Sequence, residues 1–246
     1  MGLKESGLRG SLRNVSVGID AIPDDLTDRW IADEGDGEWL ANDIGSIEID
    51  LGFDRWVSGS QYAGGFAVDT ESGDLFASDE RLELTQSEFT VAFWTDGLNI
   101  TGSNSGLVSC GDTQMPDPTS GDIVDGWSVL FPDGDGGTVS VAYINDTDFN
   151  VAIDESITVD AEQDHLMWAI VGDGDDVDLY LYDEEEQQDH LTGSASRGTQ
   201  NDGYLVWNGS GDDWAEGPYD DLTAAQNVAV GELTVDDIHD STGPNA

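Results

Sequence analysis

Short runs of alternating apolar and polar residues, separated by glycine and aspartate, limit the fold of this chain more than any other feature. In EFTVAFW, at 88–94, every second side chain is apolar and bulky, as in a β-strand with one face buried. Such runs recur every 8 to 12 residues or so, the spacing of an all-β sandwich or barrel. The other runs are GWSVLF at 126–131, TVSVAYI at 138–144, HLMWAIVG at 165–172, VDLYLYD at 177–183, GYLVWNG at 203–209 and DLTAAQNVAV at 221–230.

Turn composition between these runs predicts two hairpins. PDGDGG separates the runs at 126–131 and 138–144, and DGDD separates those at 165–172 and 177–183. The only helical turn predicted is TVDDIHD at 234–240, with Thr234 as its N-cap. The sequence therefore predicts an all-β sandwich or barrel.

Acidic residues outnumber basic ones by a wide margin. The 246 residues include 53 Asp and Glu against seven Lys and Arg, a net charge of −46, while 37% are hydrophobic, which is enough for a core. Molar salt shortens the Debye length to about 3 Å and removes the self-repulsion of such a chain. We interpret the acids as the solvated coat of a protein from a halophile, with a cation store as the alternative. Nucleic acid is excluded as a partner, because no basic face can neutralise phosphates.

Three of the seven basic residues fall in the first thirteen positions. We interpret residues 1–27 as an extended docking arm that precedes a domain at 28–240 and a tail at 241–246. The arm would dock through its leucines and cations on an acidic partner or a neighbouring copy. No apolar run reaches the length of a membrane span, and no secretory h-region is present, so we expect synthesis in the cytoplasm and no membrane insertion. The predicted docking residues are Leu3, Lys4, Leu8, Arg9, Leu12 and Arg13.

Five segments in order resemble the laminin-G-like, concanavalin A-like jelly-roll family. They are RWIADEGDGEWLAND from 29, GSQYAGGFAVDTESGDLFAS at 59–78, LTQSEFTVAFWTDG from 84, DHLMWAIVGDGDDVDLYLYDE from 164 and YDDLTAAQNVAVGELTVDDI at 219–238. The chain departs from the family pattern at Thr70, where glycine is usual, and at His165 and Trp168, whose order is reversed. The resemblance implies an all-β, two-sheet antiparallel jelly-roll sandwich, and binding of glycans or proteins more often than catalysis. The arm with AIPDD also resembles the start of proteins from haloarchaea and their tailed viruses.

A glycosidase of this fold would carry the pattern E-x-D-x-x-E on one strand, so that its carboxylates share a face. Glu48 and Asp50 begin the pattern, but Phe53 stands where the closing glutamate belongs, and Asp54 is one residue late. We therefore expect no catalytic residue. His165, His190 and His239 are not paired at zinc-ligand spacing, and Cys110 is predicted to be a small buried apolar residue.

Aspartates in the GDGDDVD turn are the best candidates for a metal, because calcium takes six to eight oxygen ligands. The turn lacks the glutamate at position twelve of an EF-hand, so a salt-adapted hairpin turn is the alternative. No cofactor is required in either case; a calcium or other divalent ion would be optional. The candidate ligands are Asp173, Asp175, Asp176 and Asp178, and PDGDGG offers Asp133 and Asp135.

Sugar binding needs an exposed aromatic ring with polar neighbours. Trp39 and Trp56 are secondary candidates for such a ring. Trp94, Trp127 and Trp168 lie in strand patterns and are predicted to be core residues. The primary ligand-binding candidates are Trp207, Asn208, Asp212, Asp213, Trp214 and Tyr219.

These features favour a non-enzymatic structural and attachment protein of a haloarchaeal virus particle, on the capsid surface or tail. In this hypothesis the arm at 1–27 anchors the protein to other virion proteins, and the jelly roll faces host surface glycans. We expect a homo-oligomer, with a trimer as the first guess. The alternatives are a cellular carbohydrate-binding or adhesion module and, third, a glycoside hydrolase.

Overall fold

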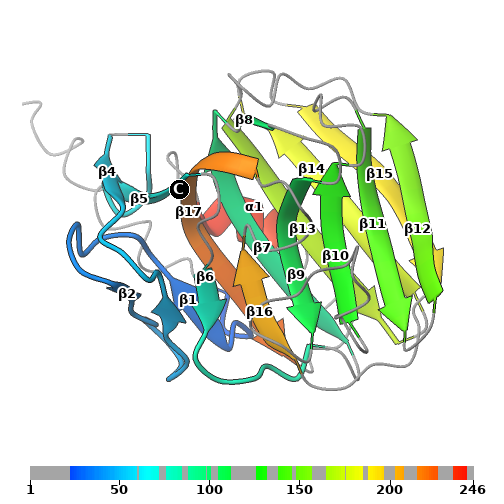
Figure 1. Cartoon of the computed structure of the whole chain (residues 1–246), viewed down its shortest axis with the longest axis horizontal. Coiled ribbons are helices and arrows are strands. Elements are labelled where there is room, and N and C mark those ends of the chain that lie inside the picture. The colour runs from blue at the N-terminus through cyan, green and yellow to red at the C-terminus, as the bar shows by residue number, and fades with distance from the viewer. Residues whose placement is uncertain are drawn as a thin grey trace, which may run out of the picture.

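The structure is a computed structural model, and two facing antiparallel sheets make up almost all of it (Figure 1). This architecture confirms the predicted all-β jelly-roll sandwich. The residues that the structure describes are 23–59, 61–71, 76–84, 88–97, 99–100, 105–111, 126–131, 138–145, 148–156, 165–174, 176–184, 188–196, 203–207, 215–226 and 235–242.

The first sheet, sheet A, has the strand order β15-β14-β13-β7-β17-β5-β4, and β1 and β8 also pair with β17. The predicted runs at 88–94, 165–172 and 177–183 are its strands β7, β13 and β14, and the predicted β13–β14 hairpin is present. The strand bounds are β1 Asp28–Trp30, β4 Trp56–Ser58, β5 Phe66–Thr70, β7 Phe89–Asp96, β8 Asn99–Ile100, β13 His165–Asp173, β14 Asp176–Asp183, β15 Gln188–Ser196 and β17 Ala215–Gln226.

The second sheet, sheet B, has the order β12-β11-β10-β9-β16-β6-β3-β2. The predicted runs at 126–131 and 138–144 form β10 and β11, which pair antiparallel as expected. The strand bounds are β2 Trp39–Leu40, β3 Ile49–Asp50, β6 Phe76–Ser78, β9 Ser105–Gly111, β10 Gly126–Phe131, β11 Thr138–Asn145, β12 Asp148–Ser156 and β16 Tyr204–Trp207.

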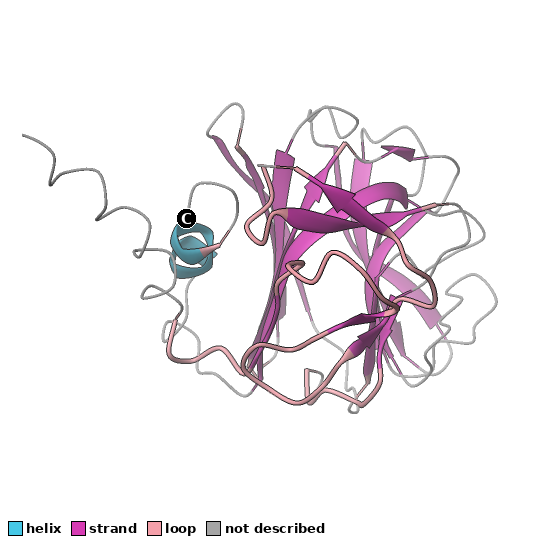
Figure 2. Cartoon of the chain, turned by 90° about the vertical axis from the view of Figure 1, so that its left-hand side faces the viewer, coloured by secondary structure: helices cyan, strands magenta, loops and turns pink. Residues whose placement is uncertain are grey.

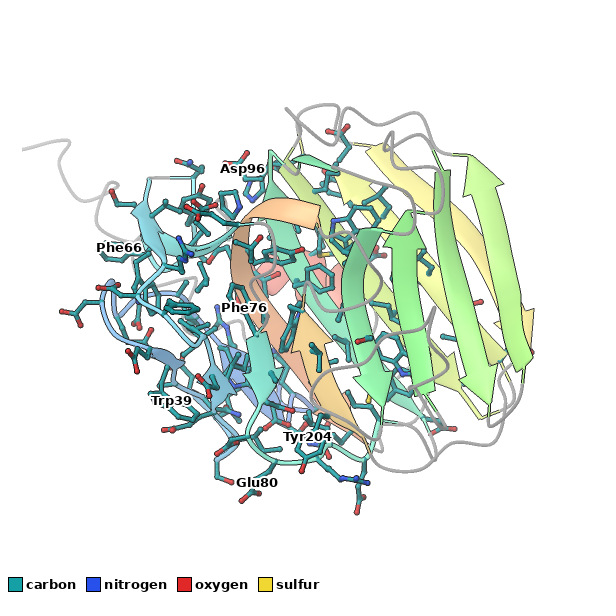
Figure 3. All side chains as sticks on the ribbon, viewed as in Figure 1. Trp39, Phe66, Phe76, Glu80, Asp96 and Tyr204 are labelled. Atoms are coloured by element: carbon teal, nitrogen blue, oxygen red, sulfur yellow. The ribbon has the colours of Figure 1, made fainter. Side chains whose placement is uncertain are left out.

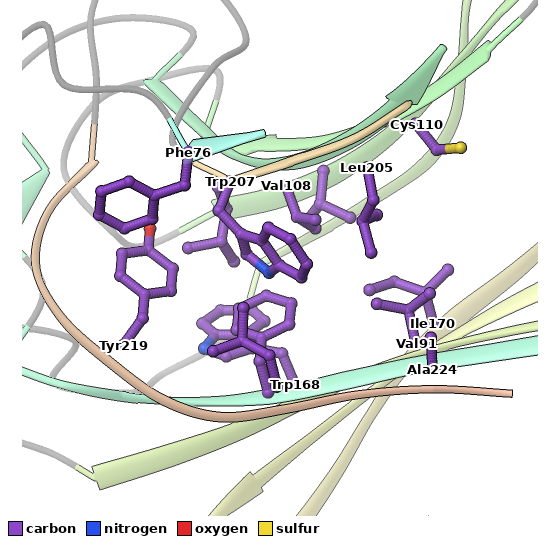
Figure 4. Packing of buried hydrophobic residues seen from close by; sticks show 14 of the residues in the cluster. Phe76, Val91, Val108, Cys110, Trp168, Ile170, Leu205, Trp207, Tyr219 and Ala224 are labelled. Carbon is purple, nitrogen blue, oxygen red and sulfur yellow. The ribbon is translucent and has the colours of Figure 1, made fainter. Parts of the chain in front are cut away.

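Large aromatic side chains fill the space between the two sheets (Figure 4). Trp30 meets Trp207 edge to face with ring centroids 5.9 Å apart, and Phe89 stacks on Trp127 at the same separation. These are favourable aromatic geometries that add to the area they bury. The predicted core residues Trp94, Trp127, Trp168 and Cys110 are all buried.

A short helix, α1 (Val235–Ser241), covers part of the outer face of sheet A (Figure 2). Ile238 is buried against Trp94, and the indole nitrogen of Trp94 donates a 3.0 Å hydrogen bond to the hydroxyl of Thr242. The predicted helical turn is therefore present, whereas its expected N-cap Thr234 lies outside the described residues. Leu26 packs in the same cluster, so the last residues of the predicted arm lie on the sandwich.

The six predicted docking residues belong to residues 1–22, which lie outside the described part of the chain. Pro23 is the first described residue, three positions before Leu26. The docking role of the arm therefore stays a prediction.

Strand β17 changes neighbours where an ion pair is buried. Its first half pairs with β5 and its second half with β1, and the register against β7 shifts between Asp220 and Thr223. Asp221, at this shift, has φ 41°, a left-handed conformation that aspartate tolerates better than most residues. Its carboxylate accepts two hydrogen bonds, 3.0 and 3.1 Å long, from the guanidinium of Arg29 on β1. The ion pair thus fixes β17 at the point where its neighbour changes from β5 to β1.

Candidate functional site

Two of the predicted sugar-binding residues are core residues instead. Trp207 and Tyr219 are each 0% exposed, Trp207 against Trp30 and Tyr219 between Phe76 and Phe93. A ring without exposed surface cannot stack on a sugar, so this prediction was wrong for both residues. The other four candidates, Asn208, Asp212, Asp213 and Trp214, lie outside the described residues.

The predicted calcium ligands lie at the β13–β14 hairpin. Asp173 and Asp176 face each other across the turn and are exposed, Gly174 between them has φ 52°, and Asp178 is half-buried. Asp175 lies outside the described residues. Within the described ranges no three His, Cys, Asp or Glu side chains come together as a metal site would need. The calcium site stays a prediction.

Three large apolar side chains are exposed among the described residues: Trp39 at 46%, Phe53 at 60% and Ile44 at 43%. Trp39 lies on β2, the last strand of sheet B (Figure 3), and Phe53 lies in the segment that leads from β3 to β4, the last strand of sheet A. Apolar surface rimmed by polar groups marks binding sites on soluble proteins. We call Trp39, Asp50, Phe53, Arg55 and Trp56 the edge surface.

The β2–β3 pair presents Trp39. Its ladder places Trp39 directly opposite Asp50 and Leu40 opposite Ile49, so the aromatic ring and the carboxylate share one face while the aliphatic pair is buried. Asp50 accepts a 2.8 Å hydrogen bond from the backbone nitrogen of Gly52. This bond fixes the turn that leads to Phe53.

Sheet A supplies the other half of the edge surface. The indole nitrogen of Trp56 donates a 3.0 Å hydrogen bond to the carbonyl of Gly37, so β4 is tied to the segment that enters β2. The guanidinium carbon of Arg55 lies 5.7 Å from the centroid of the Phe53 ring, and Arg55 pairs with Glu71 at 3.0 Å. The hydrogen bond from Trp56 thus joins sheet A to the loop that enters sheet B.

The loop before Trp39 has little freedom. Gly35 has φ 71°, and a Cβ built there would lie 2.7 Å from the Phe66 ring, so the ring packs on bare backbone. Farther along, a carboxylate oxygen of Glu34 accepts a 3.0 Å hydrogen bond from the backbone nitrogen of Ala41. These contacts hold the segment on both sides of Trp39 in one conformation.

The carboxylates that begin the glycosidase pattern lie beside the exposed tryptophan. Glu48 and Asp50 flank the buried Ile49 and are both exposed, so they share the face that carries Trp39. Phe53, at the position of the closing glutamate, is an exposed ring with no proton to transfer. The arrangement offers stacking surface and hydrogen-bond acceptors.

The described histidines lie on the opposite side of sheet A from the sandwich core. His165 is buried against Trp94, and burial lowers the pKa of its imidazole. His239, on α1, lies 3.5 Å from a carboxylate oxygen of Glu184 and packs edge to face on Tyr182. The side chain of His190 lies outside the described residues. The cluster holds α1 on the sheet.

No protein-family model and no curated protein matches this sequence. Among solved structures, domain 4 of AbnA, a GH43 extracellular arabinanase from Geobacillus stearothermophilus solved with arabinotriose, aligns with a TM-score of 0.58 and 14% identity over 88% of this chain and 98% of that one. The metal-free exoplasmic/lumenal domain of VIP36 aligns with a TM-score of 0.52 and 11% identity, covering 85% and 95% of the two chains.

An arabinofuranosidase complexed with arabinofuranosyl-alpha-1,2-xylobiose aligns with a TM-score of 0.52 and 10% identity over 82% of this chain, which spans 49% of that one. At such identities the likeness shows the fold alone, a β-sandwich that this chain shares with the three structures. No helix among the described residues is long and apolar enough to cross a membrane.

Proposed function

We propose that this chain is a non-enzymatic carbohydrate-binding module and that its edge surface is the binding site. The observation that carries the proposal is the exposure of two aromatic rings, Trp39 at 46% and Phe53 at 60%, on a surface held by hydrogen bonds from both sheets. A flat ring held in place binds the apolar face of a sugar at little entropic cost. Carboxylates beside the rings accept hydrogen bonds from sugar hydroxyls.

The carboxylates near the exposed rings favour binding without cleavage, because the set that a glycosidase needs is incomplete. A glycosidase needs an acid and a nucleophile or base on either side of the bond. Glu48 and Asp50 supply two of the three acids of the pattern, but Asp50 already accepts a backbone hydrogen bond and the third position is Phe53. A reducing-sugar assay separates the alternatives: a glycosidase releases ends from a bound polysaccharide, and a binding module does not.

Replacing Trp39 with alanine should weaken polysaccharide binding about 30-fold, since exposed tryptophans that anchor a ligand contribute about 2 kcal/mol. The measurement is affinity electrophoresis in about 3 M salt, a concentration that screens the acidic coat, through gels containing arabinan, xylan or galactomannan. Ile44→Ala is the matched control, because Ile44 is similarly exposed but aliphatic. Equal retardation of wild type and Trp39→Ala would refute the site.

The attachment role on a haloarchaeal virus particle is the more specific form of this proposal. It joins a glycan-binding surface to an anchor, and the anchor would be the basic arm within residues 1–27. The oligomeric state, the salt adaptation and the neighbouring virion proteins belong to this specific form and stay predictions. Light scattering on the full chain and on residues 23–246, a truncation that keeps the packed Leu26, tests the arm: a loss of oligomers on truncation supports the anchor.

A further inference from the structure

Resting on the proposed carbohydrate-binding function, we infer that the edge surface selects neutral glycans and rejects those that carry carboxylate or sulfate groups. The inference comes from the charges that surround the exposed rings and from the partners that those charges already have. It names a ligand class, neutral polysaccharides, that the fold by itself does not indicate.

Exposed carboxylates occur on the described segments that carry the two exposed rings. Glu38 precedes Trp39 directly, and Asp50 faces it across the β2–β3 pair. Asp54 follows Phe53 directly. The exposed acids on these segments are Asp36, Glu38, Glu48, Asp50 and Asp54.

The edge surface offers one cation, Arg55, and that cation is engaged. Its guanidinium pairs with Glu71 at 3.0 Å and lies over the Phe53 ring at 5.7 Å. Of the other arginines within the described ranges, Arg29 is buried with Asp221 and Arg81 stacks over Tyr204. An anionic sugar stacked on Trp39 would therefore face the carboxylate of Asp50 and find the guanidinium of Arg55 already paired.

Salt does not remove this selectivity. In molar salt the Debye length is about 3 Å, so distant charges no longer steer the ligand. A carboxylate bound on Trp39, however, would lie on the same face as Asp50, which is directly opposite that ring, and short-range repulsion of this kind persists and gives specificity against like charge. A neutral sugar meets no such repulsion, and its hydroxyls can donate hydrogen bonds to Glu48 and Asp50, which share the face of Trp39.

The test compares each neutral polysaccharide of the panel, arabinan, xylan and galactomannan, with its carboxymethylated derivative, so that the backbone stays constant. Affinity electrophoresis of the full chain is run at about 0.5 M and 3 M salt, which spans incomplete to nearly complete screening. We expect at least one neutral polymer to retard the protein, and this retardation should change less than about threefold between the two salt concentrations. The carboxymethylated derivative of that polymer should retard the protein at least about tenfold less.

A triple variant, Asp36→Asn with Glu38→Gln and Asp54→Asn, removes three edge charges without touching Trp39 or Phe53. It should bind the carboxymethylated polymer at least about fivefold more tightly than wild type and leave neutral binding within twofold. The matched control also removes three exposed charges, two in the turn that follows Pro23 and one on α1. Its substitutions are Asp24→Asn, Asp25→Asn and Asp236→Asn. It should change neither affinity. Thermal unfolding checks that both variants fold.

The outcomes separate the inference from the function on which it rests. Wild-type protein that binds a neutral polymer and its carboxymethylated derivative equally well would overturn neutral selectivity and leave carbohydrate binding intact. A triple variant that behaves like its control would also overturn it, because the edge carboxylates would then not be the source of rejection. Wild-type protein retained by no neutral polymer would refute the proposed function itself.

Discussion

Replacing Asp221 with alanine should lower the free energy of unfolding by about 3 to 5 kcal/mol, the range found when one partner of a buried ion pair is removed. The side chains of Arg29 and Asp221 are 6% and 0% exposed, so the variant would leave a buried guanidinium without its bidentate acceptor. Alanine also tolerates the φ of 41° less well than aspartate does. Urea unfolding in about 3 M salt (chosen for screening), followed by tryptophan fluorescence, measures the change.

Arg55→Met provides the control for this prediction. It breaks an ion pair of the same 3.0 Å length, but its partner Glu71 is 66% exposed. Exposed pairs contribute about 0 to 1 kcal/mol, so this variant should unfold close to wild type. A similar loss in both variants would show that burial does not set the strength of the pair at Asp221, and that our account of the strand β17 junction is incorrect.

Replacing Asp220 with asparagine should stabilise the protein above pH 7 and have little effect near pH 4. Asp220 is buried, and burial with the neighbouring charge of Asp221 raises the pKa of its carboxyl from 3.8 to about 7. The backbone nitrogen of Ala63 donates a 2.8 Å hydrogen bond to one carboxylate oxygen, which the amide of asparagine can still accept. The variant therefore removes the titration and keeps the contact.

The sign follows from the two states of the carboxyl. Because its pKa is higher in the folded protein, folding favours the protonated form, and its stabilising effect is complete below about pH 4 and is lost as the pH rises to about 7. The slope is about 1.4 kcal/mol per pH unit, about 4 kcal/mol in total as an upper estimate. The measured quantity is the difference in unfolding free energy between Asp220→Asn and wild type across this range.

Asp54→Asn, at an exposed carboxylate, is the control for general charge reduction, because every lost acid lowers the repulsion within a chain of charge −46. Its difference from wild type should vary little between pH 4 and pH 8. If Asp220→Asn gave the same flat profile, the buried carboxyl would not be protonated in the folded protein, contrary to our interpretation of its environment.

The strands could be predicted from the sequence wherever the run was long. The alternation in EFTVAFW predicts the strand, and β7 is observed there, but both of its faces are buried: Phe93 lies in the core between the sheets and Trp94 in the cluster with α1. The alternation in GYLVWNG also predicts that Leu205 and Trp207 share a face, and applying it would have placed Trp207 in the core. The Gly-Asp composition of the loop that follows favours an exposed ring, and the strand pattern overrides it.

The edge surface could not be predicted, because β2 and β3 have only two residues each and show no alternation. In the sequence, Trp39 is only a secondary candidate for sugar binding, and Phe53 stands out only because it occupies the position of the glycosidase pattern's last glutamate. The pair between Arg29 and Asp221 joins residues 192 positions apart, and no local pattern connects them. Contacts of this range depend on the strand order, which brings β1 beside β17.

Indole nuclear magnetic resonance tests the central claim most directly. The chain has eight tryptophans, and each indole N–H gives one proton–nitrogen signal that single Trp→Phe variants assign. Titration with the neutral oligosaccharide whose polymer is retained should shift the signal of Trp39, with a smaller shift for Trp56, and leave the buried Trp30 and Trp168 unchanged. A saturable shift at Trp214, with Trp39 unchanged, would contradict the account and move the binding site away from the edge surface.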